Sequence, residues 1–312
     1  MPLPLDTYRQ RGETASREAS VRRRLTSRSC LASLFVALAV ACGGNNTVVG
    51  PTPIPIAVLV GAGDIGPCGG GGEETGRLLD GLPGIVMALG DLAYSHGTRQ
   101  EFRACYDTAW GRHRARTHPS PGNHDYEQPG AQPYFEYFGD RAGVSGLGYY
   151  SYRLGQWHVL SLNSNIAIGR GSEQLGFVTH DLAANPAACT VAYFHHPFVT
   201  SGPNGGNAFL RDLWGLLYEQ NVDVVVTAHD HLYERFALMN ALGQRDAARG
   251  IRQFIAGTGG AELYPTAFVH VASEVRISAF GVLKLTLYPG SYEWEFLRVD
   301  GARGDTGSGA CH

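Results

Sequence analysis

Side chains that can bind metal ions recur in five short segments of this chain, and four of them directly follow an apolar run. The five segments are Gly63-Asp64-Ile65-Gly66, Gly90-Asp91-Leu92-Ala93-Tyr94, Gly122-Asn123-His124-Asp125, His195-His196-Pro197 and Ala228-His229-Asp230-His231. Carboxylate, phenol, amide and imidazole groups are all metal ligands. Together they indicate metal-dependent chemistry.

Each segment by itself is a weak signal. A Gly-Asp pair after a strand is often only a turn, in which the glycine adopts an unusual φ and the aspartate caps the next helix. The pair His229 and His231 is stronger, because alternate residues of an extended segment can face one centre. A purely structural explanation would have to account for all five segments together, and we reject it on that ground.

Five apolar runs predict strands, and four of them precede these segments. The runs are Ile56–Val60, Ile85–Leu89, Trp157–Leu162, Thr190–Phe194 and Asp223–Thr227, and helix-compatible stretches lie between them at Glu73–Leu79, Thr98–Tyr106, Ser172–Leu182 and Ala208–Glu219. Ligands of open α/β sheets gather outside the carboxyl ends of the strands, so the polar segments are expected to converge. Two further strands, Gly281–Tyr288 and Tyr292–Val299, flank a Pro289-Gly290 turn.

The ordered pattern GDx, GDxx, GNH, lone His and GHxH resembles the calcineurin-like metallophosphoesterases. Tyr94 and the stretch from His231 to Arg235 narrow the resemblance to the purple acid phosphatase branch. The sequences at 105–107 and 110–112 resemble those of secreted bacterial members. The additional N-terminal β domain of the plant enzymes is not expected in this chain. The resemblance covers residues 56–300. It implies an α/β fold, a four-layer α/β/β/α sandwich of two mixed sheets in a single domain at 56–312.

The resemblance also implies a ligand set for two metal ions. Asp64, Tyr94 and His231 would hold one ion, Asn123, His195 and His229 the second, and Asp91 would bridge them. His195 is preferred over His196 because the family ligand stands two residues before the proline, and His196 is interpreted as a packing or mouth residue. Phenolate and carboxylate favour Fe(III) at the first site, whereas two imidazoles and an amide oxygen suit Zn, Fe(II) or Mn at the second.

The function implied is hydrolysis of phosphate monoesters by a metal-bound hydroxide, as in an acid phosphatase. His124 would contact the phosphate or the leaving group, and Asp125 would orient the His124 ring. Two alternatives stay open: a phosphodiesterase acting on cyclic nucleotides or other diesters, and a metal-containing surface binding protein with weak catalysis.

The chain departs from the family pattern in two places. Ala228 stands where GHxH has glycine, at a cost in backbone freedom. In the family, one or two further histidines that face the substrate stand about ten residues beyond the lone histidine ligand. Residues 200–207 of this chain contain no histidine. His96 and His118 lie near the metal-binding segments and are candidates to replace them, although surface positions are the simpler interpretation. Asn163 and Asn165 could either line the pocket or shape a turn.

The N-terminus predicts export. Residues 1–41 have a basic stretch and an apolar run from Leu31 to Ala41, which is shorter than the about 20 residues of a membrane span. Small residues before Cys42 resemble a lipoprotein signal, so Cys42 is a candidate lipid anchor, and 42–55 is expected to be a flexible tether. The product would be periplasmic, attached to the cell surface or otherwise secreted, with no other link to the membrane.

Charge and cysteine content fit an exported protein. Without residues 1–41, 18 basic and 25 acidic side chains remain, a net charge of −7, which argues against nucleic-acid binding. Four cysteines remain, Cys68, Cys105, Cys189 and Cys311, and in an exported chain they suggest two disulfides with three conceivable pairings. Because Cys68 and Cys105 flank the first two metal-binding segments, we predict that these two pair and leave Cys189 to Cys311. The oligomeric state is left open.

Overall fold

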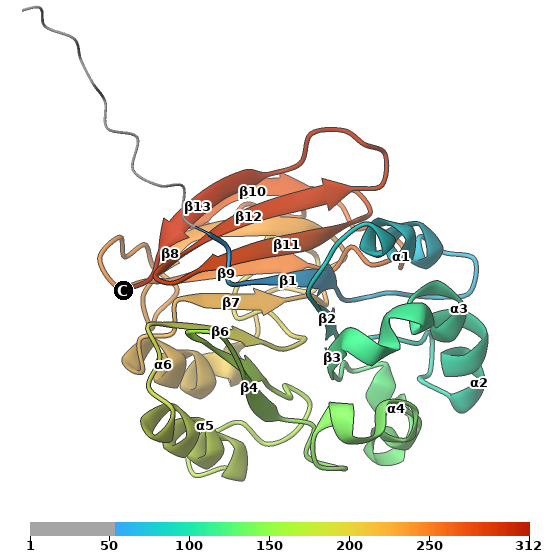
Figure 1. Cartoon of the computed structure of the whole chain (residues 1–312), viewed down its shortest axis with the longest axis horizontal. Helices are drawn as coiled ribbons and strands as arrows, with labels where there is room; N and C mark the ends of the chain where they lie inside the picture. The colour runs from blue at the N-terminus through green and yellow to red at the C-terminus, as the bar shows by residue number, and fades with distance from the viewer. Residues whose placement is uncertain (1–53) are drawn as a thin grey trace, which may run out of the picture. The chain divides into compact units, whose positions relative to one another are not determined.

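Two mixed β-sheets form the body of the protein in the computed structural model, which describes residues 54–312 (Figure 1). One sheet has the strand order β13-β12-β11-β1-β2-β3, with β1 Ala57–Ala62, β2 Ile85–Leu89, β3 Thr117–Ser120, β11 Gly281–Tyr288, β12 Ser291–Arg298 and β13 Thr306–Ala310. The other has the order β10-β8-β9-β7-β6-β5-β4, with β4 Tyr150–Leu154, β5 Trp157–Ser161, β6 Cys189–Tyr193, β7 Val224–Thr227, β8 Tyr233–Met239, β9 Ile251–Ala256 and β10 Ser273–Ile277. Strands β1 to β3 are parallel, as are β5, β6, β7 and β9.

The two sheets pack face to face around a hydrophobic core. Leu285 and Trp294 from the first sheet meet Val191, Val226 and Phe254 from the second in one buried cluster. The strands that cross the middle of this core are apolar on both faces, since all four residues of β7 are buried. Such uninterrupted burial is expected of parallel strands covered on both sides.

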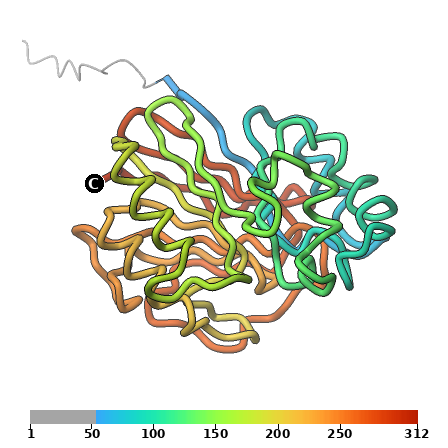
Figure 2. Tube along the Cα trace, turned by 90° about the horizontal axis from the view of Figure 1, so that it is seen from below, coloured from blue at the N-terminus to red at the C-terminus, as the bar shows by residue number. Residues whose placement is uncertain are grey.

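Helices cover the outer face of each sheet. One set consists of α1 Gly72–Asp80, α2 Arg99–Glu101, α3 Asp107–Ala109 and α4 Gln132–Phe138, and the other of α5 Glu173–Ala184 and α6 Arg211–Glu219. The first set, with the π-helix Phe102–Tyr106 between α2 and α3, packs Phe102, Tyr106 and Tyr134 on β1 and β2. The second set packs Val178 and Trp214 on β6 and β7. Figure 2 shows the two helical groups on opposite sides of the strands. The expected four-layer α/β/β/α sandwich is therefore confirmed.

The predicted elements occur close to their expected bounds, with differences at two helices. The segment expected as one helix from Thr98 begins with α2, capped by Thr98 and Glu101, and continues as a π-helix at Phe102–Tyr106. The segment 208–219 opens with a 3₁₀ turn at Ala208–Leu210 before α6. Strands β3, β4, β8, β9, β10 and β13 were not predicted.

Two disulfides join distant parts of the fold. Cys68 pairs with Cys105, and Cys189 pairs with Cys311, so the predicted pairing is confirmed. The second bridge fastens the residue after β13 to the start of β6. The expected signal segment at 1–41, the Cys42 anchor and the tether up to residue 53 lie outside the described residues. Among residues 54–312, no helix is long and apolar enough to cross a membrane.

Candidate metal centre

The expected ligands all follow strands whose carboxyl ends point to one edge of the fold. Asp64 follows β1, Asp91 and Tyr94 follow β2, and Asn123 follows β3. The histidines come from the other sheet, where His195 follows β6 and the pair His229 and His231 follows β7. The site is thus assembled where the two sheets meet.

Asp64, Tyr94 and His231 form one cluster. The Tyr94 hydroxyl donates a hydrogen bond to Asp64 Oδ1 at 2.8 Å, and it lies 3.2 Å from His231 Nε2. His231 Nε2 is in turn 3.3 Å from Asp64 Oδ1. The three side chains expected to hold the first ion therefore present their donor atoms to one point.

Asn123, His195 and His229 form the second cluster. His195 Nε2 lies 3.1 Å from Asn123 Oδ1 and 3.2 Å from His229 Nδ1. Asp91 touches both clusters, because its Oδ2 atom lies 3.2 Å from His195 Nε2 and 3.2 Å from the Tyr94 hydroxyl. This is the position that a bridging carboxylate requires.

Backbone carbonyls hold two of the imidazoles in the orientation that a metal ligand needs. His195 Nδ1 lies 2.8 Å from the Leu89 carbonyl, and His231 Nδ1 lies 2.6 Å from the Glu262 carbonyl. A carbonyl only accepts hydrogen bonds, so each Nδ1 carries the proton and Nε2 is left free to bind a cation. Tyr264 stacks on the His231 ring with 4.0 Å between centroids.

The electrostatics of the site fit bound cations. Asp64 and Asp91 are 0% and 1% exposed, and no lysine or arginine pairs with either among residues 54–312. Burial would raise the pKa of Asp91, but His195 and His124 hold it well below its usual range. Burial would lower the pKa of His195, yet Asp91 and Asp64 raise it to about 9. Burial, Asp64 and Asp91 raise the pKa of the Tyr94 phenol. Two buried carboxylates that have only imidazoles as basic partners are costly, and metal ions would relieve that cost.

The backbone around the site is strained. Asp64, Asp91 and His229 have φ values of 55°, 52° and 71°, in the left-handed region that non-glycine residues avoid. Gly122 is required by close packing, because a Cβ atom there would lie 2.1 Å from Asp91 Oδ1. Such strain concentrates at functional sites, where the surrounding structure imposes it.

His124 lies at the rim of the site, but Asp125 does not orient it. The His124 ring is partly exposed, and its Nδ1 atom lies 2.6 Å from the Ser95 carbonyl. The Asp125 carboxylate instead accepts the backbone N–H groups of Asp91, Leu92 and Gly122 at 3.0, 3.2 and 2.8 Å. The expectation that Asp125 aims the His124 ring is wrong. The carboxylate follows His124 on a tight turn that points it back under the Asp91 loop.

Of the residues whose role was left open, His196 alone reaches the cluster. A ring nitrogen of His196 lies within 4.8 Å of ring nitrogens of His195 and His229. His118 packs its ring on Tyr152, 4.3 Å between centroids, and His96 is exposed. Neither touches a candidate ligand among the described contacts.

Asn163 and Asn165 shape the loop after β5. The Asn163 amide donates to the Tyr126 hydroxyl and the Leu147 carbonyl, both at 2.8 Å, while its oxygen accepts the Asn165 backbone N–H at 3.0 Å. Asn165 donates to the Pro121 carbonyl at 2.8 Å. The side-chain amides of both residues are therefore engaged in hydrogen bonds that stabilise the loop.

Alanine at position 228 causes no backbone strain there. Its φ is not among the positive values, and the left-handed conformation falls on His229. The methyl group is fully buried against Gly63, where an added Cβ atom would lie 2.5 Å away. Glycine at 63 thus makes room for alanine at 228, and the expected loss of backbone freedom does not arise.

Sequence reasoning missed three residues near the site. Ser164 contacts His196, Tyr264 stacks on His231, and Phe209 packs against the His196 ring at 5.5 Å. The polar run 163–165 after a strand was a usable signal for Ser164. We find none for Tyr264 or Phe209.

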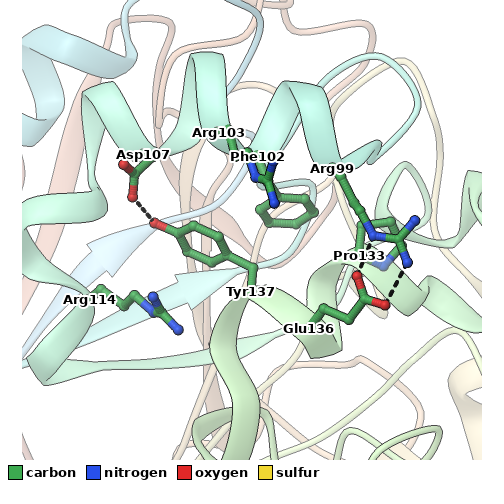
Figure 3. Close-up of a pocket in the computed structure, with 8 residues that line it drawn as sticks. All are labelled: Arg99, Phe102, Arg103, Asp107, Arg114, Pro133, Glu136 and Tyr137. Carbon is green, nitrogen blue, oxygen red and sulfur yellow. Dashed lines mark hydrogen bonds and ion pairs between the residues drawn. The ribbon is translucent and has the colours of Figure 1, made fainter.

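A separate hollow of about 320 Å³ lies among the helices of the first sheet (Figure 3). Its charged groups are partly paired, since Arg99 binds Glu136 and the Tyr137 hydroxyl donates to Asp107, as the dashed lines show. None of the candidate metal ligands lines it. The candidate metal ligands of this chain therefore lie apart from this hollow, at the strand ends.

Comparison with known proteins defines the class. The family model described as calcineurin-like phosphoesterase matches residues 58–233. The chain belongs to this family, as its motifs predicted. Purple acid phosphatase 15 of Arabidopsis thaliana is 26% identical over 225 residues, which are 60% of this chain and 42% of that protein. The chain is thus similar to the purple acid phosphatase-like branch of this family. The chain spans about half the length of the curated relatives it matches.

Solved structures confirm the fold. Purple acid phosphatase PPD1 from yellow lupin (Lupinus luteus) seeds superposes with a TM-score of 0.68 at 19% identity, covering 83% of this chain and 55% of that one. GAP50, the anchor in the inner membrane complex of Plasmodium, gives 0.63 at 12% identity, covering 82% and 89%. Because one fold serves such different proteins, activity must be argued from the site.

Proposed function

We propose that this chain is a dinuclear-metal phosphoesterase that hydrolyses phosphate monoesters. One observation carries the proposal: two three-residue donor clusters lie side by side, and the Asp91 carboxylate contacts both. Family membership and the relatives named purple acid phosphatase support it.

The residues of the site have separate tasks in this reaction. Two bound ions would supply a hydroxide nucleophile at moderate pH and neutralise charge on the phosphoryl oxygens. Asp64, Tyr94 and His231 would hold one ion, Asn123, His195 and His229 the other, and Asp91 both. His124 Nδ1 is committed to the Ser95 carbonyl, so Nε2 is the ring atom that would give a proton to the leaving group. Asp125 keeps the Asp91 loop in place.

The donor types favour different ions at the two sites. A phenolate and carboxylates suit Fe(III), which we assign to the Tyr94 site. Two imidazoles and an amide oxygen suit Zn, Fe(II) or Mn, which we assign to the site of Asn123. Metal analysis of the purified protein, combined with its visible absorption spectrum, tests both assignments.

Paired substrates test the function. Metal-replete protein should hydrolyse a nitrophenyl phosphate monoester much faster than a bis-nitrophenyl diester, and His229→Ala should abolish the activity, because His229 is expected to be a ligand of the second ion. A preference for the diester would establish a phosphodiesterase. Absence of hydrolysis of both esters by protein that contains two ions would leave a metal-containing binding protein.

We also propose that the mature protein is exported and attached to the membrane through Cys42. The two disulfides support an oxidising compartment. Cys42→Ser should move the protein from the membrane fraction to the soluble fraction of cells that express the full chain. Unchanged fractionation would contradict the lipid anchor. A phosphate ester is the partner we expect, with no nucleic acid.

A further inference from the structure

His196 lies beside the second donor cluster but has a different hydrogen-bond environment. It follows His195 directly after β6, and its ring centroid is 4.4 Å from that of His229. Its ring is half-buried, and the exposed Phe209 packs edge-on against it. The ring therefore occupies the border between the buried cluster and solvent.

Ser164 determines which ring nitrogen of His196 carries the proton. Ser164 Oγ accepts the backbone N–H of His196 at 3.2 Å and lies 2.8 Å from His196 Nδ1. Ser164 is buried, and Nδ1 is the one acceptor within reach of its hydroxyl hydrogen among residues 54–312, so the assignment that satisfies both groups gives this hydrogen to Nδ1. Nδ1 is then the acceptor, and Nε2 of the neutral imidazole carries the N–H.

This arrangement distinguishes His196 from the neighbouring ligands. His195 and His231 donate Nδ1–H to carbonyls and keep an unprotonated Nε2 for a metal ion. His196 has the opposite tautomer, so its free nitrogen is a hydrogen-bond donor. That Nε2–H finds no partner among the described residues, which leaves it available to an anionic ligand at the border of the site.

We propose that His196 Nε2–H donates a hydrogen bond to a phosphoryl oxygen of the bound substrate, with Ser164 as the positioning residue. The inference rests on the proposed function, and it supplies a substrate-contacting histidine to a chain that has none at 200–207. Because the hydrogen bond would go to a phosphoryl oxygen, it should strengthen binding of inorganic phosphate as well as of esters.

Calorimetric titration of protein loaded with two ions, using inorganic phosphate as the probe, tests this role. His196→Ala and His196→Phe should each weaken phosphate binding about 10- to 100-fold, the usual value of a hydrogen bond to a charged group. His196→Phe keeps an aromatic ring beside Phe209 but lacks both ring nitrogens. His196→Gln, which places an N–H near Nε2, should recover part of the loss. Ser164→Ala should give a smaller loss, because the ring can then take either tautomer. Exposed His180→Ala on α5 is the matched control and should bind phosphate normally.

Metal content measured on the same samples completes the test. Phosphate affinity of His196→Phe within twofold of wild type, with both ions present, would overturn the inference. Loss of an ion from His196→Phe would also overturn it, because His196 would then be a ligand. Phosphate binding that depends on His196 in a protein that hydrolyses no ester would support the contact and contradict the proposed function.

Discussion

The Asp125 carboxylate accepts the backbone N–H of Asp91 at 3.0 Å, from 34 positions further along the chain. With its bonds to Leu92 and Gly122, this contact ties the loop after β3 to the loop after β2. Asp125 thus supports the metal centre through the backbone of Asp91, whereas its neighbour His124 faces the rim.

Asp125→Asn should loosen that support. An amide has one acceptor oxygen, so at least one of the three buried backbone N–H groups would face an NH₂ group, at a cost of about 1–3 kcal/mol. We expect lower metal affinity and a lower free energy of unfolding, measured by metal titration and chemical denaturation. Asp140→Asn, at an exposed carboxylate, is the control.

The same substitution should change the pH dependence of stability in metal-free protein. Burial and the neighbouring Asp91 raise the pKa of Asp125 to about 7, against about 3.9 for an ordinary aspartate. Folded protein holds this proton more tightly than the unfolded chain, so Asp125 makes the free energy of unfolding fall between about pH 4 and pH 7. Asp125→Asn should remove that contribution. Parallel stability profiles for wild type and Asp125→Asn would contradict the assignment.

Tyr94→Phe tests the iron assignment. If Tyr94 binds Fe(III) as phenolate, the purified protein is purple to pink, and the substitution should bleach it. Tyr264→Phe should keep the colour, because the Tyr264 ring stacks on His231 without being an expected ligand. A colourless wild-type protein with two divalent ions would refute Fe(III) at this site. It would not contradict the proposed phosphoesterase activity.

Asp91 should be the least replaceable ligand. Its carboxylate contacts His195 and Tyr94 and also accepts the His124 backbone N–H at 2.7 Å. We expect Asp91→Asn to lose both ions and the activity together, measured by metal analysis and turnover of a nitrophenyl monoester. Two retained ions with near-normal turnover would exclude a bridging role.

His124→Ala should separate substrates by their leaving groups. An alkoxide needs a proton to depart and nitrophenolate does not, and general acid catalysis typically contributes about 10²–10⁴-fold. We expect turnover of alkyl phosphates to fall far more than turnover of nitrophenyl phosphate, with both ions retained. Equal losses would instead identify His124 as a phosphate-binding group, as proposed for His196.

Removal of the second disulfide should destabilise the fold. Cys189 and Cys311 are 122 residues apart, and loss of a native bridge typically costs about 2–5 kcal/mol. Cys311→Ser should lower the free energy of unfolding by such an amount, measured by denaturation without reductant. Wild type in reductant, which opens both bridges, should lose at least as much. Peptide mapping that finds the four cysteines free in exported protein would contradict both bridges.

Much of the site was predictable because its signals are local. Four short apolar runs lead directly into metal-capable side chains, and a fifth segment adds Asn123 and His124, so these side chains were expected to meet at the strand ends. The parallel runs at β1, β2, β6 and β7 have no other way to bury their side chains than between covering layers. The fold class and the assignment of each candidate ligand came from the resemblance of these motifs to the calcineurin-like metallophosphoesterases.

Tertiary structure decided the partners of those side chains. Asp125 and His124 are adjacent in sequence, yet one binds the Asp91 loop and the other the Ser95 carbonyl. The tautomer of His196 depends on Ser164, 32 positions away in a loop after a different strand. Hydrogen bonds of this kind require strand order, loop path and side-chain direction to be correct together. No local pattern encodes them, because each contact joins loops that follow two neighbouring strands of one sheet, and only the tertiary structure sets which strands are neighbours.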